Sequence, residues 1–349
     1  MVKKKLVIIQ EKLMHYRVGL FNILSEKYDL TVLTSKLEES IKKDEIFFEL
    51  KYLESSSLNR FVIFKNLRDE LDEVNPDVII STFDLRLISV VKYFFVNKNK
   101  KLIWWGLDKG ASDIALKIKL KIANFISKPI LFYSKHNMNE FRKLGLKSNI
   151  LFFANNTFPV GNTYNTSRME KKSILFVGSF DERKDLPTLI VSFKELSTRY
   201  HDIHLTLIGD GECFEDIKLM ISNLSLDTLV NVVGRINDSD QLARYYEESF
   251  VSVSYGQAGL SVLQSLAFGV PFITHKDSIS GSEKHNIVDG HNGFFVNSAS
   301  ELESRMELLL NNESIRIKIS DNAYDWYSRH CTVENMASQF VDCIEREVK

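Results

Sequence analysis

Two adjacent cations, Arg183 and Lys184, lie in a loop between an apolar segment and a helix. The apolar run 174–177 ends at Gly178, and Pro187 lies near the first turn of the helix that follows, where its missing N–H costs nothing. Cations beside a helix N-terminus make a ready anion site, because the free amides and the helix dipole also favour negative charge. The alternative is a solvated turn in which the charges pair locally, and this segment alone does not distinguish the two.

A second segment, residues 254–271, joins a strand to a helix through Gly256 and Gly259 and ends in Gly269-Val270-Pro271. Both glycines let backbone amides approach a phosphate at the helix start. Tight strand-to-helix turns also use glycine for steric reasons, so the pair is weak evidence by itself. It gains weight because it follows the cationic loop in the same half of the chain.

From residue 174 to residue 296 the chain resembles the C-terminal domain of the retaining glycosyltransferases of the GT-B fold, the large family four that builds bacterial surface polysaccharides and lipopolysaccharides. Six landmarks in family order carry the resemblance: the turn 177–184 with Val-Gly-Ser-Phe and Arg-Lys, the turn 207–211, Val233-Gly234-Arg235, the helix start 259–263, the exit 269–271, and 289–294 with Asp-Gly and Asn-Gly-Phe.

The resemblance implies a role for each matched position. Arg183 and Lys184 would hold the donor diphosphate and stabilise it as a leaving group, and the amides of Gly259 and Leu260 would cap it. The segment after Gly234 would line the base pocket. The donor-binding residues that follow are Gly178, Ser179, Gly209, Asp210, Arg235, Ile236, Gly256, Gln257, Ala258, Gly259, Leu260, Ser261 and Gln264.

The sequence departs from the family at two places. The family usually has two glutamates eight positions apart around the glycine loop, where this chain has Gly256 and Gln264. Gln264 can still hydrogen-bond a ribose hydroxyl through its amide, whereas Gly256 has no side chain for a sugar hydroxyl. The sugar, the base (UDP or GDP) and the stereochemistry of transfer therefore stay open.

In the N-terminal half, His15, Tyr16 and Arg17 follow the first expected strand and resemble an entry sequence of some of these enzymes, which places them on the acceptor side. The alternative is a surface loop with Tyr16 as a packing residue. Asp108 follows the expected strand 102–106, where related enzymes often have a polar residue near the transferred sugar. It is the catalytic candidate of this half, with a plain helix cap as the alternative.

No metal or cofactor is expected. Asp238 and Asp240 match the acidic pair of metal-dependent glycosyltransferases, but they precede a helix and are expected to cap it. The histidines show no ligand spacing. The family resembles a metal-free design in which cations and a helix dipole replace the metal ion.

Short apolar runs alternate with helix-length amphipathic segments, which predicts an α/β protein with parallel sheets and crossover helices. We expect the GT-B arrangement, two doubly wound Rossmann-like domains facing across a cleft, with ligands at the carboxyl ends of the strands. The expected strands are 6–10, 30–34, 47–53, 78–81, 102–106, 130–134 and 150–154 in the first half, and 174–179, 205–209, 230–234, 250–254, 271–274 and 293–296 in the second.

The expected domains are an acceptor-binding domain at 1–156 and a nucleotide-sugar-binding domain at 173–331. Residues 157–172 are rich in Asn, Thr and Ser and lack apolar periodicity, so they are the expected linker. Residues 332–349 form an expected helix whose apolar face docks back toward the N-terminal domain.

Composition narrows the class of protein. The chain has 349 residues, of which 44% are hydrophobic, with 15 Gly and 5 Pro, which excludes a disordered or collagen-like protein. Its three cysteines lack disulfide or metal spacing, and no apolar run is long enough to cross a bilayer, so we expect a cytoplasmic protein.

Residues 1–156 carry 27 Lys and Arg against 18 Asp and Glu, whereas residues 157–349 carry 18 Lys and Arg against 28 Asp and Glu. This asymmetry favours a phosphorylated ligand or an anionic membrane over nucleic acid.

The Lys-rich segment 92–128 is the expected membrane contact. Lys117, Lys121, Asn124 and Lys128 form one polar stripe at helical spacing, and Lys119 falls on the apolar side, where a long side chain can snorkel at a membrane interface. The alternative is an ordinary solvated helix face. We therefore expect the enzyme at the inner face of the membrane.

These observations predict a glycosyltransferase that moves a sugar from a nucleotide diphosphate sugar to a hydroxyl of a glycan, lipid-linked, in cell-surface polysaccharide synthesis. One alternative is a GT-B epimerase of nucleotide sugars, which needs carboxylates that the loop 256–264 lacks. A second is a catalytically weak scaffold that binds a nucleotide sugar.

Overall fold

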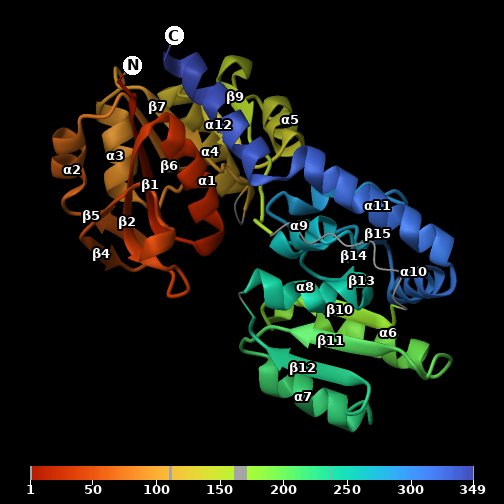
Figure 1. Cartoon of the computed structure of the whole chain (residues 1–349). Helices are drawn as coiled ribbons and strands as arrows, with labels where there is room; N and C mark the ends of the chain where they lie inside the picture. Colours follow the sequence, from red (N-terminus) through yellow and green to blue (C-terminus); the bar gives the residue numbers. More distant parts are fainter. Residues whose placement is uncertain (1, 110–111, 161–170, 237, 349) are drawn as a thin grey trace. The chain divides into compact units, whose positions relative to one another are not determined.

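A computed structural model describes residues 2–109, 112–160, 171–236 and 238–348, and the chain divides into two compact units (Figure 1). Unit 1 comprises Met1–Thr157 and Val333–Lys349, and unit 2 comprises Phe158–Thr332. The predicted end of the first domain at 156 and the predicted start of the last helix at 332 lie within one residue of these divisions, whereas unit 2 begins at Phe158 and the predicted second domain at 173. Most of the predicted linker, residues 161–170, lies outside the described residues.

Unit 1 is built on a parallel sheet with the strand order β3-β2-β1-β6-β7-β8-β9. Leu6, in the third strand of that order, pairs with Leu30 on one side and with Val78 on the other. The strands are β1 (Lys5–Leu13), β2 (Asp29–Leu37), β3 (Glu49–Tyr52), β6 (Val78–Thr82), β7 (Leu102–Trp105), β8 (Ile130–Phe132) and β9 (Leu151–Phe153).

The sheet of unit 1 is covered on both faces, which explains the continuous apolar run at the start of the chain. Val7 and Ile9 point into one hydrophobic cluster, and Leu6 and Ile8 point into the other. The first cluster is closed by α2 (Leu67–Val74), α3 (Ile88–Val96), α4 (Asp113–Ile126) and α5 (Lys135–Lys143), and the second by α1 (His15–Lys27) and α12 (Val333–Val348).

Helix α12 returns the end of the chain to unit 1, where it packs beside α1. Phe340 is fully buried and meets the ring of Trp105 edge-on, with 5.0 Å between the ring centres. The apolar face that the sequence predicted for this helix is thus part of the core of unit 1.

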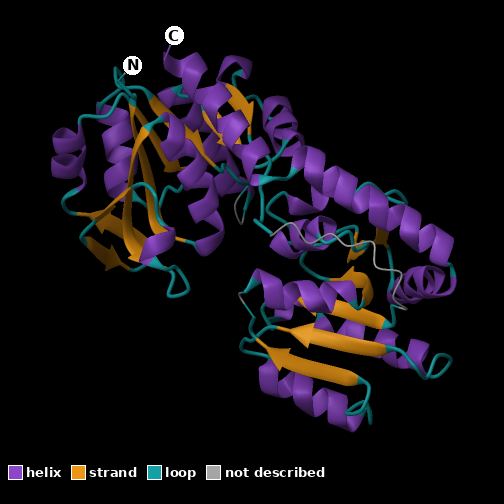
Figure 2. Cartoon of the chain, in the orientation of Figure 1, coloured by secondary structure: helices purple, strands orange, loops and turns teal. Residues whose placement is uncertain are grey.

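Unit 2 is built on a parallel sheet with the strand order β12-β11-β10-β13-β14-β15 (Figure 2). The strands are β10 (Ser173–Val177), β11 (His204–Ile208), β12 (Val230–Gly234), β13 (Ser249–Val253), β14 (Phe272–His275) and β15 (Gly293–Val296). The helices are α6 (Leu186–Ser197), α7 (Phe214–Asn223), α8 (Ser239–Glu247), α9 (Leu260–Ala267), α10 (Ala299–Asn311) and α11 (Glu313–His330).

The predicted α/β class with parallel sheets is confirmed, and a strand lies at each position where the sequence predicted one. The antiparallel hairpin of β4 (Ser55–Leu58) and β5 (Phe61–Phe64) was not predicted. Its first strand is rich in serine and has no buried apolar face, so it lacks the alternation that identifies a strand. Asn59, with φ of 54°, makes the tight turn. Among the described residues, no helix combines the length and apolarity needed to span a membrane.

Replacing Phe340 by Ala should lower the free energy of unfolding of unit 1 by about 3–5 kcal/mol, because it removes a buried aromatic ring that the neighbouring helix and sheet cannot replace. Trp104 and Trp105 lie in unit 1 and Trp326 lies in unit 2, so tryptophan fluorescence in a Trp326→Phe background reports urea unfolding of unit 1 alone. Ser338→Ala, at an exposed position of the same helix, is the control and should change the value by less than about 0.5 kcal/mol. Equal effects of both substitutions would contradict the docking of α12.

Candidate functional site

Lys184 is buried in the loop between β10 and α6, although lysine is rarely found in that environment. Its side chain is 7% exposed, and its Nζ donates to the carbonyl oxygen of Gln257 over 3.4 Å. Burial lowers the pKa of this ammonium, while the negative charges of Asp181 and Glu283 act in the opposite direction. No carboxylate in the described ranges forms an ion pair with it, so an anionic ligand would complete its environment.

Arg183 points away from this buried position. Its side chain is largely exposed, and its Nη2 contacts Oδ2 of Asp181 at 2.9 Å. Hydrogen bonds from Arg183 are the main cause of the lowered pKa of Asp181. The sequence left open whether both cations pair with neighbouring carboxylates in a solvated turn. Arg183 does so with Asp181, whereas Lys184 does not.

Glycines bring the loops after β10 and β11 into direct contact. The amide of Gly178 donates to the carbonyl of Ile208 over 3.0 Å, and a Cβ at Gly209 would lie 1.8 Å from the carbonyl oxygen of Gly178. A Cβ at Gly178 would itself lie 3.3 Å from Cε of Lys184. Asp210 accepts from Phe180 through its backbone carbonyl at 2.9 Å. The predicted donor residues of these two loops thus lie together.

The start of α9 presents unpaired donors and buried polar side chains. Gly259 is the N-cap, and the N–H groups of Leu260 and Ser261 have no acceptor in the part of the chain that the structure describes. The buried hydroxyl of Ser261 likewise has no hydrogen-bond partner there. Gln264 follows one turn later and is also buried. This end of α9 can therefore receive an anion and a hydroxyl-bearing group.

Gly256 is the point where the glycine loop meets the cationic loop. Its amide donates to the carbonyl of Lys184 over 3.1 Å, and a Cβ at this position would lie 2.4 Å from the carbonyl oxygen of Arg183. Only glycine fits this approach. The glutamate that the resemblance to family four would lead one to expect at position 256 therefore does not fit this backbone.

Glu283 belongs to this site and was not predicted from the sequence. It is buried in the loop between β14 and β15, and its carboxylate accepts from the amide of Ser282 at 2.9 Å. Its negative charge acts on Lys184, which is distant in sequence. A single glutamate between two strands carries no sequence signal, since only the fold brings it close to Lys184.

The segment after β12 is described in part. Arg235 is exposed, and Ile236 packs on an apolar cluster with Val233. Asp238 caps α8, as predicted, because its carboxylate accepts from the amides of Asp240 and Gln241 at 3.0 and 2.9 Å. Within the described ranges, no group of three His, Cys, Asp or Glu side chains is arranged to hold a metal ion.

In unit 1, His15, Tyr16 and Arg17 form the first turn of α1. Glu38 accepts from both the amide and the Nδ1 of His15, at 2.9 and 2.7 Å. Burial opposes ionisation of Glu38, but these hydrogen bonds outweigh it and lower its pKa. Tyr16 packs edge-on against His15. Arg17 turns inward and is buried.

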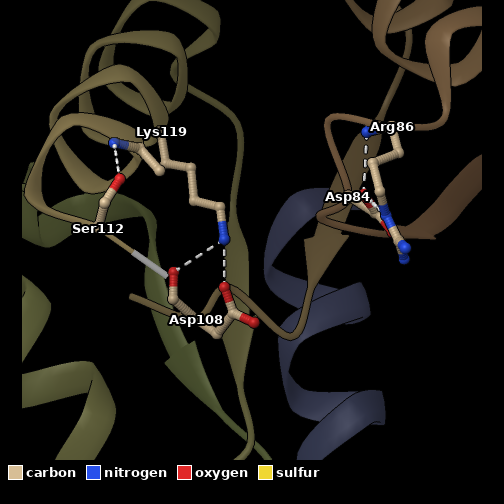
Figure 3. A network of polar contacts seen from close by, with 6 residues as sticks. Asp84, Arg86, Asp108, Ser112 and Lys119 are labelled. Atoms are coloured by element: carbon tan, nitrogen blue, oxygen red, sulfur yellow. Dashed lines mark hydrogen bonds and ion pairs between the residues drawn. The ribbon is translucent and has the colours of Figure 1, made fainter. Parts of the chain in front are cut away.

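Two ion pairs follow the neighbouring strands β6 and β7 (Figure 3). Arg86 binds both carboxylate oxygens of Asp84 and lowers its pKa despite burial, a pair that the sequence did not predict. Asp108 pairs with Lys119. Ser112, not Asp108, caps α4, so the helix-cap interpretation of Asp108 is wrong. The snorkelling predicted for Lys119 is also wrong, because its ammonium turns to Asp108 and its side chain is only 16% exposed.

Comparisons with known proteins agree with this architecture. Residues 164–326 match the family described as glycosyl transferases group 1. An uncharacterized glycosyltransferase of Haemophilus influenzae is 26% identical over 298 residues, which cover 83% of this chain and 78% of the relative.

Two solved structures share the fold of the whole chain. HepE of Anabaena, in complex with UDP, has a TM-score of 0.77 at 16% identity and covers 98% of this chain and 100% of its own. WaaG, a glycosyltransferase involved in lipopolysaccharide biosynthesis, has a TM-score of 0.69 at 14% identity and covers 95% and 98%. The predicted GT-B fold is confirmed by this likeness.

Gly256→Ala should lower the free energy of unfolding of unit 2 by about 1–3 kcal/mol, because the new methyl group must displace the backbone of the cationic loop. Gly259→Ala is a matched control on the same loop, since a Cβ there meets nothing within 4 Å, and it should cost less than about 1 kcal/mol. Hydrogen exchange of the strand amides of unit 2 in increasing denaturant measures both. The close approach at Gly256 is refuted if the two variants unfold alike.

Proposed function

Because residues 164–326 match the family described as glycosyl transferases group 1, we propose that the chain transfers a sugar from a nucleotide diphosphate sugar to a hydroxyl of a glycan. The observation that carries the proposal is the buried ammonium of Lys184 beside the free N-terminus of α9. Glycosyl transfer releases a nucleoside diphosphate, and its developing negative charge needs positive groups fixed in advance. Lys184 and the amides of Leu260 and Ser261 supply them.

The remaining donor contacts follow from the same geometry. The buried amide of Gln264 is placed one turn into α9 and would receive a ribose hydroxyl. Arg183 would reach the diphosphate only by leaving Asp181, so we assign it the smaller share of binding. The proposal includes turnover without a divalent metal, since fixed cations and helix amides carry the charge of the leaving group.

The reaction that we propose retains the configuration of the sugar, as the resemblance to family four implies, and Asp108 is the candidate beside the transferred sugar. Its acceptor is proposed to be a lipid-linked glycan of cell-surface polysaccharide. WaaG, whose fold the chain shares, acts in lipopolysaccharide biosynthesis, and this supports the proposal.

The membrane contact that we propose for the Lys-rich segment 92–128 rests on α4. Ile114, Ile118 and Phe125 of this helix are exposed apolar residues, and Lys117 and Lys121 are on the same helix. An exposed apolar row with flanking lysines favours an anionic membrane surface. The enzyme would therefore work on the cytoplasmic face, held there reversibly.

Lys184→Ala should reduce kcat/KM for transfer by the equivalent of about 2–3 kcal/mol, because charge-assisted contacts to a leaving group strengthen in the transition state. Lys218→Ala, an exposed lysine of unit 2, is the control and should behave as the wild type. Release of UDP or GDP from nucleotide sugars, with a glycan acceptor and after chelation of metals, measures the effect. Wild-type turnover by Lys184→Ala would remove the phosphate role, and donor isomerisation without acceptor would identify an epimerase.

Lys117→Glu combined with Lys121→Glu should weaken binding to anionic vesicles, since each lysine near such a surface contributes about 1 kcal/mol. Co-sedimentation with vesicles of increasing phosphatidylglycerol content measures binding at low and high salt, where screening should weaken it further. The charge-matched control is Lys42→Glu with Lys43→Glu, outside the segment. Binding that is indifferent to lipid charge, salt and the α4 substitutions would leave α4 as a solvated helix face.

A further inference from the structure

Arg17 is a buried arginine without an oxygen partner. Its side chain is 5% exposed, and within the described residues its guanidinium makes one hydrogen bond, a weak contact from Nη1 to the sulfur of Met336 over 3.6 Å. Neither a carboxylate nor a carbonyl oxygen bonds its guanidinium in the part of unit 1 that the structure describes. An arginine at this depth normally pairs with an anion, because an uncompensated buried charge is costly.

Aromatic rings surround the guanidinium instead. Its central carbon lies 4.5 Å from the ring centre of Trp105, 5.0 Å from that of Tyr16 and 5.3 Å from that of Tyr133. Cation–π contacts offset part of the lost hydration but leave the planar N–H groups without acceptors. The indole N–H of Trp105 is a second buried donor without a partner in the described ranges.

Two helix N-termini converge on the same place. Arg17 is in the first turn of α1, and Met336 is in the first turn of α12. Val333 lies close to Gly19, whereas Lys27 and Tyr28 contact Glu345 near the other end, so the two helices run parallel (Figure 1). Their positive dipole ends therefore add to the charge of Arg17.

Among the residues that the structure describes, no carboxylate forms an ion pair with Arg17. The first turn of α1 has no acidic residue, and Glu334, in the first turn of α12, is exposed. Glu38 is bound to His15 and forms no ion pair with Arg17. Trp105 ends β7 and Tyr16 follows β1, so the cluster stands at the carboxyl edge of the sheet, where α/β proteins bind ligands.

We propose that Arg17 and the N-termini of α1 and α12 bind a phosphoryl group of the acceptor. A guanidinium fork matches phosphate oxygens bidentately, and helix N-termini add amide donors and a favourable dipole. The assignment to the acceptor rests on the proposed function, in which the donor diphosphate is held by unit 2. The phosphoryl group belongs either to a soluble phosphorylated glycan or to a lipid phosphate.

Calorimetric titration with glycerol 3-phosphate tests the site on the full chain. The wild type should bind this probe, Arg17→Met should bind it at least about tenfold more weakly, and Arg17→Lys should fall between them because it keeps charge without the fork. Arg68→Met, an exposed arginine of unit 1, should bind as the wild type does. Tryptophan fluorescence checks that each variant is folded. If Arg17→Met does not fold, the affinity of Arg17→Lys relative to the wild type tests the site.

A second arm distinguishes the source of the phosphate. Sedimentation with phosphatidylglycerol vesicles that falls in Arg17→Met identifies a lipid phosphate, whereas unchanged sedimentation with weakened glycerol 3-phosphate binding identifies a soluble one. Equal affinity of wild type and folded Arg17 variants for glycerol 3-phosphate, or no binding by the wild type, overturns the inference.

Titration with UDP and GDP separates this result from the proposed function. Nucleotide affinity should be unaffected by Arg17→Met and reduced by Lys184→Ala. If the wild type binds neither nucleotide while glycerol 3-phosphate binding still depends on Arg17, the donor assignment fails and the phosphate site stands.

Discussion

The contact between the backbone of the cationic loop and Gly256 determines the chemistry of unit 2. The amide of Gly256 holds the carbonyl of Lys184, and the missing side chain at 256 lets the two loops touch. With its backbone fixed there, Lys184 extends past Gly178 to the carbonyl of Gln257 instead of into solvent. The same loop carries Gly259 and the free amides of α9. One steric requirement therefore places a buried cation beside a helix N-terminus, and it also leaves no room for a side chain at position 256.

Each unit contains a buried cationic side chain, Lys184 in unit 2 and Arg17 in unit 1, that forms no ion pair with a described carboxylate. In unit 2 the group is an ammonium, whose pKa is lowered by burial. In unit 1 it is the guanidinium of Arg17, which aromatic rings surround. Burying such a group without an anion is costly, so an anionic ligand that paired with it would remove part of that cost. The excess of Lys and Arg in residues 1–156 would also draw anions toward unit 1.

The sequence predicted the sheets well because their strands are buried on both faces, which leaves runs such as residues 6–9 that only a covered parallel strand explains. The loops that we propose for donor binding stand out in the sequence because their glycines and cations follow strand ends. The sequence alone could not show which of Arg183 and Lys184 is buried. That depends on the direction in which the folded backbone points each side chain. The partners of Lys119 and Glu283 could not be predicted either, because they lie in other parts of the chain. The Asp84–Arg86 pair was also not predicted. Arg17 appeared as an acceptor candidate, but its burial among rings from three elements depends on tertiary packing.

The return of α12 to unit 1 has a consequence for biosynthesis. Unit 2 is one uninterrupted stretch, Phe158–Thr332, whereas unit 1 is assembled from both sides of it. A ribosome therefore completes every part of unit 2 before it delivers the helix that covers Trp105 and brings Met336 to Arg17. Until then the nascent unit 1 exposes the part of one apolar sheet face that α1 does not cover, and exposed apolar surface favours aggregation or chaperone binding. The order of synthesis therefore lets unit 2 complete its fold first, and unit 1 completes its core only when α12 has been made.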